Sequence, residues 1–278
     1  MAPSLTEPNA APPILYGTAW KKERTAALVE RALELGFRGV DTACQPKHYD
    51  EPGVGRGVTA FLAQDGARES LYLQTKFTPR DGQDPKRLPY DPSAPLALQI
   101  EQSCRASLAN LSTTYLDALL LHSPIRPFEK TLEAWRAFEA QVDAGVVRAL
   151  GISNCYDPKQ LAVLWQTARI KPSIVQNRFY RDTGYDKELR AFCRQHDIRY
   201  QSFWTLTANP HLIAHRDVQA LAARYAATPA QVLFRYLTQV GVTPLTGTAS
   251  EHHMQEDLAI FQLTLEPPEI ARITRLLD

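Results

Sequence analysis

Short apolar runs alternate along the chain with longer stretches in which apolar residues recur every three or four positions. The short runs are almost continuously apolar, which is typical of strands buried on both faces. They predict eight strands, at Ile14–Thr18, Gly39–Thr42, Leu71–Lys76, Ala118–His122, Ala149–Ser153, Ile174–Gln176, Tyr200–Trp204 and Val242–Leu245. The longer stretches predict a helix after each strand, at Arg24–Leu35, Val54–Leu62, Ala97–Leu111, Leu132–Ala144, Pro158–Ala168, Lys187–Arg194, Asp217–Ala226 and Glu251–Phe261. Two further helices are expected, at Pro229–Thr238 and Pro267–Leu277.

Regular alternation of strands and helices predicts an α/β fold with a parallel sheet covered by helices. Eight such units in 278 residues favour a closed (β/α)8 TIM barrel over an open doubly wound sheet. We find no low-complexity linker, internal repeat or domain boundary. Residues 1–278 are therefore expected to form a single domain, in which residues 1–12, rich in Pro and Ala, form a loose lead-in.

The segment Thr78–Pro95 departs from the helical pattern. It holds five prolines and the turn pair Asp81-Gly82, too many helix breakers for a helix. Long loops in compact domains are usually functional. This loop leaves the carboxyl end of the third predicted strand, and in barrels of this kind that end of the sheet carries the active site.

Composition and charge exclude several classes of partner. The net charge is +1, from 31 basic and 30 acidic residues, and no basic run occurs, so neither nucleic acid nor an anionic membrane is expected. No apolar stretch is long enough to span a bilayer, and the N-terminus lacks the layout of a signal peptide. The four cysteines are scattered without a CxxC pair, which favours a reducing cytoplasm over a disulfide framework. We expect a cytoplasmic monomer or weak homo-oligomer.

Polar residues stand where the second to fourth predicted strands end. These are Asp41, Lys76 and His122, and Tyr49 lies in the loop after the first of them. A lysine in a strand as apolar as that of Lys76 needs a carboxylate partner, because an unpaired buried charge is very costly, and Asp41 is the candidate. A tyrosine beside such a pair is a candidate acid catalyst, since a nearby positive charge lowers the pKa of the phenol. These residues predict an active site, although His122 taken alone would more often be a core histidine.

Later predicted strands end in amide and aromatic residues. Asn154 and Gln176, with Phe203 and Trp204 nearby, suit a planar carboxamide such as nicotinamide. The stretch Thr246–Ser250 precedes a helix start, where a phosphate can meet backbone N–H groups. Each signal is weak alone, since the aromatics could be ordinary barrel residues and the polar stretch a helix cap. Their order along one face of the barrel favours a nucleotide site.

With these segments in order, the chain resembles the aldo-keto reductase superfamily over nearly its whole length. The matching segments are Gly17-Thr18, Gly36–Ala43, Tyr115–His122, Gly145–Asn154 and Pro172–Gln176. The resemblance implies an NAD(P)H-dependent oxidoreductase that reduces an aldehyde or ketone by hydride transfer. It also implies a small-molecule carbonyl substrate and a Tyr, Lys, His, Asp tetrad.

Three members of the implied tetrad match the family position by position, namely Asp41, Lys76 and His122. The tyrosine does not. The family's usual spacing after the aspartate falls on Pro46, and counting back from Val54-Gly55 gives His48. Tyr49 is the only tyrosine in that loop, so we assign the general acid to Tyr49 with a local change in loop length. His48 is the alternative.

The resemblance also assigns cofactor and substrate residues. The expected cofactor residues are Gly17, Thr18, Asp41, Ser153, Asn154, Gln176, Phe203, Trp204, Leu206, Thr246, Gly247, Thr248, Ser250, His253, Glu256 and Asp257. Ser153, Asn154 and Gln176 match the carboxamide ligands, and Phe203 matches the aromatic ring that stacks on nicotinamide. The expected substrate residues are Trp20, Tyr49 and His122.

The phosphate end departs from the family pattern. Where the family commonly has a lysine after the proline of the eighth strand, this chain has Leu245, and His253 stands where an arginine is common. Those two cations would hold the 2′-phosphate, so without them discrimination for NADPH should be weaker. We expect NADPH as the cofactor, with NADH as an alternative.

Two rival functions follow from the same sequence. One is a non-catalytic nucleotide-binding regulatory subunit on the same fold, which a complete tetrad disfavours. The other is a metal-dependent barrel hydrolase. His211 and His215 have the spacing of a metal pair, but no third ligand accompanies them, so no metal site is expected.

Overall fold

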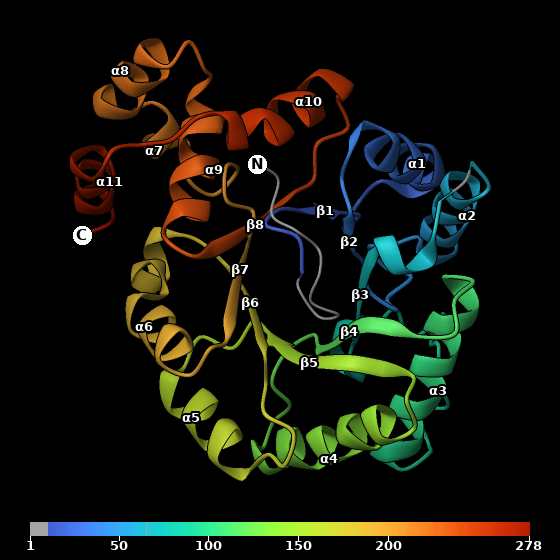
Figure 1. Ribbon diagram of the computed structural model, residues 1–278. Helices are drawn as coiled ribbons and strands as arrows, with labels where there is room; N and C mark the ends of the chain where they lie inside the picture. Colours follow the sequence, from blue (N-terminus) through green and yellow to red (C-terminus); the bar gives the residue numbers. More distant parts are fainter. Residues whose placement is uncertain (1–10, 65) are drawn as a thin grey trace.

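The computed structural model describes residues 11–64 and 66–278. In these residues eight parallel strands close into one barrel in chain order, and helices surround it (Figure 1). The strands are β1 (Leu15–Gly17), β2 (Gly39–Asp41), β3 (Tyr72–Phe77), β4 (Leu116–Leu121), β5 (Val147–Ser153), β6 (Ile174–Arg178), β7 (Arg199–Phe203) and β8 (Val242–Thr246). The predicted (β/α)8 barrel is confirmed.

The helices are α1 (Thr25–Leu35), α2 (Glu51–Leu62), α3 (Leu96–Asn110), α4 (Glu129–Asp143), α5 (Pro158–Thr167), α6 (Lys187–Gln195), α7 (Pro210–Ile213), α8 (Arg216–Arg224), α9 (Pro229–Gln239), α10 (Glu251–Ala259) and α11 (Pro267–Thr274). All ten predicted helices are present. Helix α2 begins three residues before the predicted start, because the Asp50 side chain accepts a hydrogen bond from the Gly53 amide and Pro52 suits the first turn. Helix α7 was missed, since four residues are too few to show a helical period.

Side chains that point into the barrel form two layers of different character. The lower layer is apolar and consists of Leu15, Tyr72, Ala118, Leu120, Ile174 and Leu245, with Ala11 beneath them. Because side chains of a strand alternate between its faces, the next inward residues toward the carboxyl end include Gln74, Gln176 and Gln201. All three glutamines are buried, so the barrel has a polar interior just below its mouth.

The predicted lead-in is only partly described. Residues 1–10 lie outside the described residues, and for Ala11 and Pro12 the expectation of a loose segment was wrong. Both are buried at the base of the barrel, where Arg199 Nη1 donates to the Ala11 carbonyl at 2.7 Å. A rigid contact forms here because the apolar lower layer would otherwise be open to water at this end.

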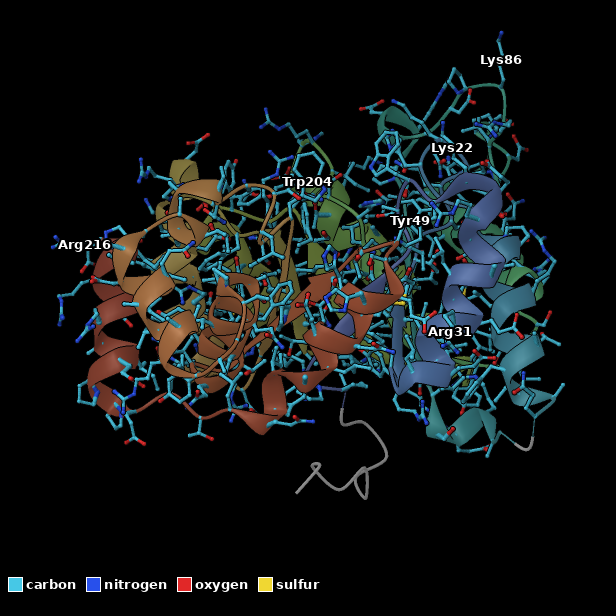
Figure 2. All side chains as sticks on the ribbon, turned by 90° about the horizontal axis from the view of Figure 1, so that it is seen from above. Lys22, Arg31, Tyr49, Lys86, Trp204 and Arg216 are labelled. Carbon is cyan, nitrogen blue, oxygen red and sulfur yellow. The ribbon has the colours of Figure 1, made fainter. Side chains whose placement is uncertain are left out.

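The proline-rich segment 78–95 forms a loop with one short 3₁₀ turn at Arg80–Gly82, and Lys86 in this loop projects outward from the molecule (Figure 2). Hydrogen bonds tie it to the loop that follows β2. Gln45 Nε2 donates to the Gly82 carbonyl at 2.6 Å, and Gln83 Nε2 donates to the Cys44 carbonyl at 2.9 Å. The segment therefore supports the loop that carries His48 and Tyr49.

Within the described residues, no helix combines the length and apolarity that crossing a bilayer requires.

Candidate active site

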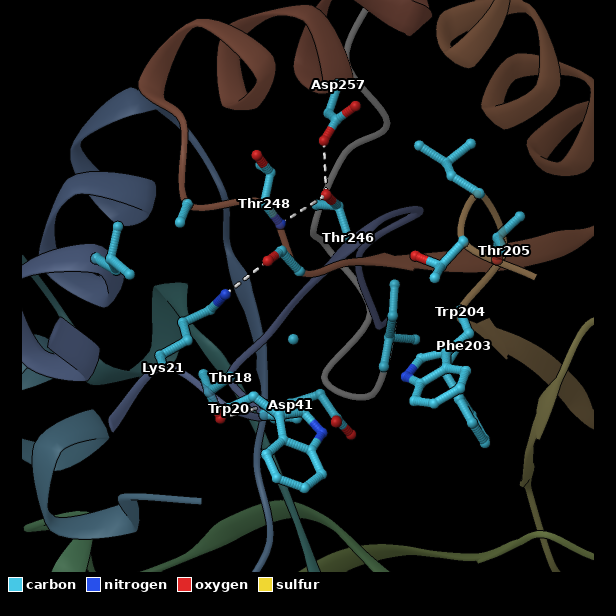
Figure 3. A pocket seen from close by; sticks show the side chains of 18 of the residues that line it. Thr18, Trp20, Lys21, Asp41, Phe203, Trp204, Thr205, Thr246, Thr248 and Asp257 are labelled. Carbon is cyan, nitrogen blue, oxygen red and sulfur yellow. Dashed lines mark hydrogen bonds between the residues drawn. The ribbon is translucent and has the colours of Figure 1, made fainter. Parts of the chain in front are cut away.

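A cavity of about 1260 Å³ opens at the carboxyl ends of the strands. Figure 3 shows Trp20 and Trp204 on opposite sides of it. Of the residues predicted to act in catalysis or binding, all line the cavity except Lys76 and Ser250. Lys76 is buried below the cavity floor. Ser250 does not line the cavity; its hydroxyl caps α10 by accepting a hydrogen bond from the His253 amide.

Lys76 and Asp41 form the buried ion pair that the sequence predicts. Lys76 Nζ lies 2.7 and 2.6 Å from the two carboxylate oxygens of Asp41 and 2.8 Å from the Thr42 carbonyl. Both side chains are almost fully buried, at 1% and 3% exposure. All three N–H groups of the ammonium therefore have acceptors, which is what a buried lysine requires.

Two glutamines hold Asp41 from below. Gln74 Nε2 and Gln176 Nε2 donate to Asp41 Oδ1 at 2.6 and 2.8 Å. Gln74 and Gln201 also exchange hydrogen bonds across the barrel, at 2.8 and 2.9 Å. The inner oxygen of the carboxylate thus accepts hydrogen bonds from Lys76 and from two amides.

Tyr49 lies between the ion pair and the cavity. Lys76 Nζ is 5.5 Å from the centre of its ring, and the rings of Tyr49 and His122 pack edge to face at 6.1 Å. Among the described residues the Tyr49 hydroxyl has no hydrogen-bond partner, so it is available to a ligand.

The Lys76 ammonium alone would lower the pKa of the Tyr49 phenol, but the net shift in this structure is upward. Burial and the nearby Asp41 carboxylate raise the pKa of the Tyr49 phenol above its ordinary value. The ammonium does not offset this because its donors point to Asp41 and Thr42, whose oxygens largely neutralise it. Tyr49 is therefore a firmly protonated phenol, as a proton donor at neutral pH should be.

His122 completes the group at the cavity wall. Burial lowers the pKa of its imidazole to about 3, and the charges of Lys76 and His48 act in the same direction. The ring is neutral at physiological pH. Its Nδ1 is 2.6 Å from the Thr78 hydroxyl, and when that hydroxyl donates, the ring carries its proton on Nε2.

His48, the alternative acid, lies farther toward the rim. Its ring stacks on Trp20 with centroids 4.0 Å apart, and its Nδ1 is 3.0 Å from Gln45 Oε1. The His48 carbonyl accepts from the Trp20 amide at 2.7 Å, which joins the two loops. Tyr49, not His48, is the residue stacked over Lys76.

The residues expected to bind the carboxamide are held by internal hydrogen bonds. Ser153 Oγ donates to the Gln176 carbonyl at 2.7 Å, and Asn154 Nδ2 donates to the His122 carbonyl at 2.8 Å. Gln176 Nε2 faces Asp41, and among the described residues nothing donates to Gln176 Oε1. A rigid amide acceptor beside the hydroxyl of Ser153 and the half-exposed ring of Phe203 fits a nicotinamide carboxamide.

The loop after β8 forms the other end of the cavity. Thr246 Oγ1 donates to Asp257 Oδ2 at 2.6 Å, and burial raises the pKa of the Asp257 carboxyl to about 6. Lys21 Nζ donates to the Gly247 carbonyl at 2.7 Å (Figure 3). Leu245 is buried in the lower layer of the barrel, so the cation at this end comes from β1 and its loop, not from β8.

Three residues around the cavity have a left-handed backbone that side chains other than glycine rarely adopt. They are Trp20, Asn154 and Trp204, with φ of 65°, 54° and 55°. Such conformations are strained, and they persist where surrounding structure fixes them, typically at ligand sites. The backbone at both tryptophans and at Asn154 is thus held by the structure around it.

Sequence reasoning missed some residues that line the cavity, among them Lys21, Arg178, Thr205 and Thr207. Lys21 directly follows Trp20, and its approach to the β8 loop depends on closure of the barrel between β1 and β8. Arg178 could have been found from its spacing, because it lies two residues after Gln176 on the same strand.

The described residues contain no cluster of three or more His, Cys, Asp or Glu side chains arranged for a metal.

Comparison with known proteins agrees with this geometry. The family model "Aldo/keto reductase family" matches residues 13–278. An aldo-keto reductase of Mycobacterium avium is 32% identical over 257 residues, which cover 92% of this chain and 82% of that protein. The chain belongs to the aldo/keto reductase family. It is accordingly an oxidoreductase that acts on carbonyl compounds with a nicotinamide cofactor.

Other relatives share the same architecture. The methylglyoxal reductase DkgA of Salmonella typhimurium is 26% identical, with 98% of this chain and 92% of that protein covered. Among solved structures, the aldo/keto reductase of Brucella melitensis superposes with a TM-score of 0.80 at 25% identity, covering 96% of this chain and 95% of the other. This aldo/keto reductase thus spans 82–95% of the length of these three proteins.

Proposed function

We propose that this aldo/keto reductase reduces a small-molecule aldehyde or ketone at the barrel mouth, with Tyr49 as the general acid. The observation that carries the proposal is one constellation. A protonated phenol without a protein partner lies over a buried ammonium–carboxylate pair and beside a neutral imidazole at one cavity wall. The relatives named as reductases support turnover, and none supports the regulatory-subunit alternative.

The chain's own residues divide the work of carbonyl reduction. When bound, the nicotinamide cofactor supplies the hydride. His122 orients the carbonyl oxygen, and the Tyr49 hydroxyl gives its proton to that oxygen as negative charge develops there. Lys76 stabilises the resulting phenolate, because its ammonium is the nearest positive charge to the ring. Asp41, held by Gln74 and Gln176, keeps Lys76 in position.

We propose NADPH as the preferred cofactor, with NADH as an alternative. Ser153, Asn154 and Gln176 would hold the carboxamide, and Phe203 would stack on the nicotinamide ring. Lys21 supplies positive charge near the β8 loop. The acidic Asp257 in the same region weakens discrimination in favour of a 2′-phosphate.

We also propose that the protein works in the cytoplasm, as a monomer or weak homo-oligomer. Its four cysteines, Cys44, Cys104, Cys155 and Cys193, are all free and buried, which supports a reducing compartment.

A titration of nicotinamide fluorescence with NADPH and NADH, followed by a panel of aldehydes and ketones, tests the proposed function. We expect saturable binding of at least NADPH and consumption of the reduced cofactor with a simple aldehyde. Saturable binding without turnover of any carbonyl compound would instead favour a regulatory nucleotide-binding role.

A further inference from the structure

Arg178 points toward the reacting end of the cavity. It ends β6 two residues after Gln176, so both side chains lie on the inward face of the strand. Gln176 Nε2 lies 2.8 Å from Asp41 Oδ1. Arg178 is therefore the next inward-facing residue of β6 toward the barrel mouth after Gln176, which contacts the Asp41–Lys76 pair. It lines the same cavity.

Aromatic rings hold the Arg178 guanidinium in place. Its central carbon is 4.3 Å from the centre of the Trp204 ring and 5.1 Å from that of Tyr180. Trp204 has a left-handed backbone, with φ of 55°. Stacking of this kind orients a guanidinium and leaves its edge, which carries the N–H groups, open to a ligand.

Arg178 has no anionic partner among the described residues, unlike Arg68, Arg148 and Arg224, which also stack on tyrosine rings. Arg68 and Arg148 both stack on Tyr115, and both bind Asp117, at 2.7 and 3.2 Å. No ion pair among the described residues includes Arg178, and its buried Nε has no hydrogen-bond partner. A half-buried cation with unfilled donors is unfavourable unless a ligand completes it.

We propose that Arg178 binds an anionic oxygen group, carboxylate or phosphate, of the carbonyl substrate. This inference rests on the proposed function and adds the substrate class, namely aldehydes or ketones that carry such an anion. A planar guanidinium matches the paired oxygens of these groups through two parallel hydrogen bonds. The anion would then be anchored at β6 while the carbonyl group reaches Tyr49 and His122.

The test compares two aldehydes that differ mainly in charge, para-carboxybenzaldehyde and para-methylbenzaldehyde. In the wild type, kcat/KM should be higher for the carboxylated compound. In Arg178→Met, the ratio of the two kcat/KM values should fall by about ten- to a hundredfold, the range expected for losing a charge-assisted hydrogen bond. Arg181→Met is the matched control, since Arg181 is an exposed arginine outside the cavity, and it should leave the ratio unchanged.

A second measurement needs no variant and so does not depend on how Arg178→Met folds. With para-methylbenzaldehyde as substrate, benzoate should inhibit the wild-type enzyme competitively and more strongly than benzamide. Equal inhibition by the two compounds, or an unchanged aldehyde ratio in Arg178→Met, would overturn the inference.

The outcomes also separate three sources of failure. If neither aldehyde is reduced, the proposed function itself fails. If the neutral aldehyde is reduced without preference for the anionic one, only the role of Arg178 is refuted. If Arg178→Met weakens NADPH and NADH binding with an unchanged aldehyde ratio, the anion is a phosphate of the cofactor and the substrate assignment is wrong.

Discussion

Tyr49 and His48 are adjacent, yet only Tyr49 stacks over the Lys76 ammonium. We therefore expect Tyr49→Phe to lower kcat for carbonyl reduction by about 10²- to 10⁴-fold, because the proton transfer to the alkoxide is lost. Cofactor dissociation constants, measured by nicotinamide fluorescence, should stay near wild type. His48→Ala is the comparison, and an inactive His48→Ala beside an active Tyr49→Phe would transfer the acid role to His48.

At Lys76, we expect a single substitution to affect both turnover and folding. Lys76→Met should abolish turnover and leave the Asp41 carboxylate buried without its cation. Removing one partner of a buried ion pair typically costs about 3–5 kcal/mol of unfolding free energy. Urea unfolding of the variant would measure this loss. Unfolding as stable as the wild type's would mean that the pair contributes nothing to stability.

At the scale of strands and helices, the sequence predicts most of the fold but only part of the site. Apolar periodicity located the strands and the long helices, and the polar ends of β2, β3 and β4 predicted Asp41, Lys76 and His122 correctly as neighbours of one cavity. Gln74 and Gln201 gave no such signal. A glutamine inside an apolar strand is compatible with either face, and only the register of the closed barrel shows that the two meet across its axis.

Strands β3 and β7 are joined through that glutamine pair, which gives an element-scale prediction. Gln201→Leu should lower the unfolding free energy by about 1–3 kcal/mol, because Gln74 loses two buried hydrogen bonds and Gln176 loses one. Adding Gln74→Leu should cost less than the two single losses combined, since both polar partners are then removed. A double-mutant cycle from urea unfolding measures this, and strict additivity would contradict the pairing.

We propose that the β8 loop and α10 set the preference between NADPH and NADH. Asp257 is ionised above about pH 6. With Glu256 it stands where the family contacts adenine, close to His253 at the proposed 2′-phosphate site. Asp257→Asn should therefore raise NADPH affinity relative to NADH several-fold near neutral pH, by removing like-charge repulsion. Glu251→Gln makes the same charge change on α10 at a residue that does not line the cavity, and serves as the control. Identical ratios of the two dissociation constants in wild type and Asp257→Asn would place the phosphate elsewhere.

At the scale of the whole molecule, the buried site should make folding sensitive to acid. The pKa of His122 falls from an ordinary 6.5 to about 3 on folding. Below about pH 6.5, His122 binds a proton in the unfolded chain but stays neutral in the folded protein. The contribution of this group to the unfolding free energy therefore falls as the pH falls. Asp257 acts in the opposite direction, because its raised pKa lets the folded state bind a proton first.

Comparing wild type with His122→Asn isolates the histidine, because Asp257 is present in both proteins. Between about pH 7.5 and about pH 5, the His122 contribution to the unfolding free energy falls by about 2 kcal/mol in the wild type and not at all in the variant. Urea unfolding of both proteins at the two pH values measures the difference. His122→Asn should thus lose less stability on acidification than the wild type. Parallel losses in the two proteins would show that the imidazole becomes protonated in the folded state, and a neutral His122 at the carbonyl oxygen would then be untenable in mild acid.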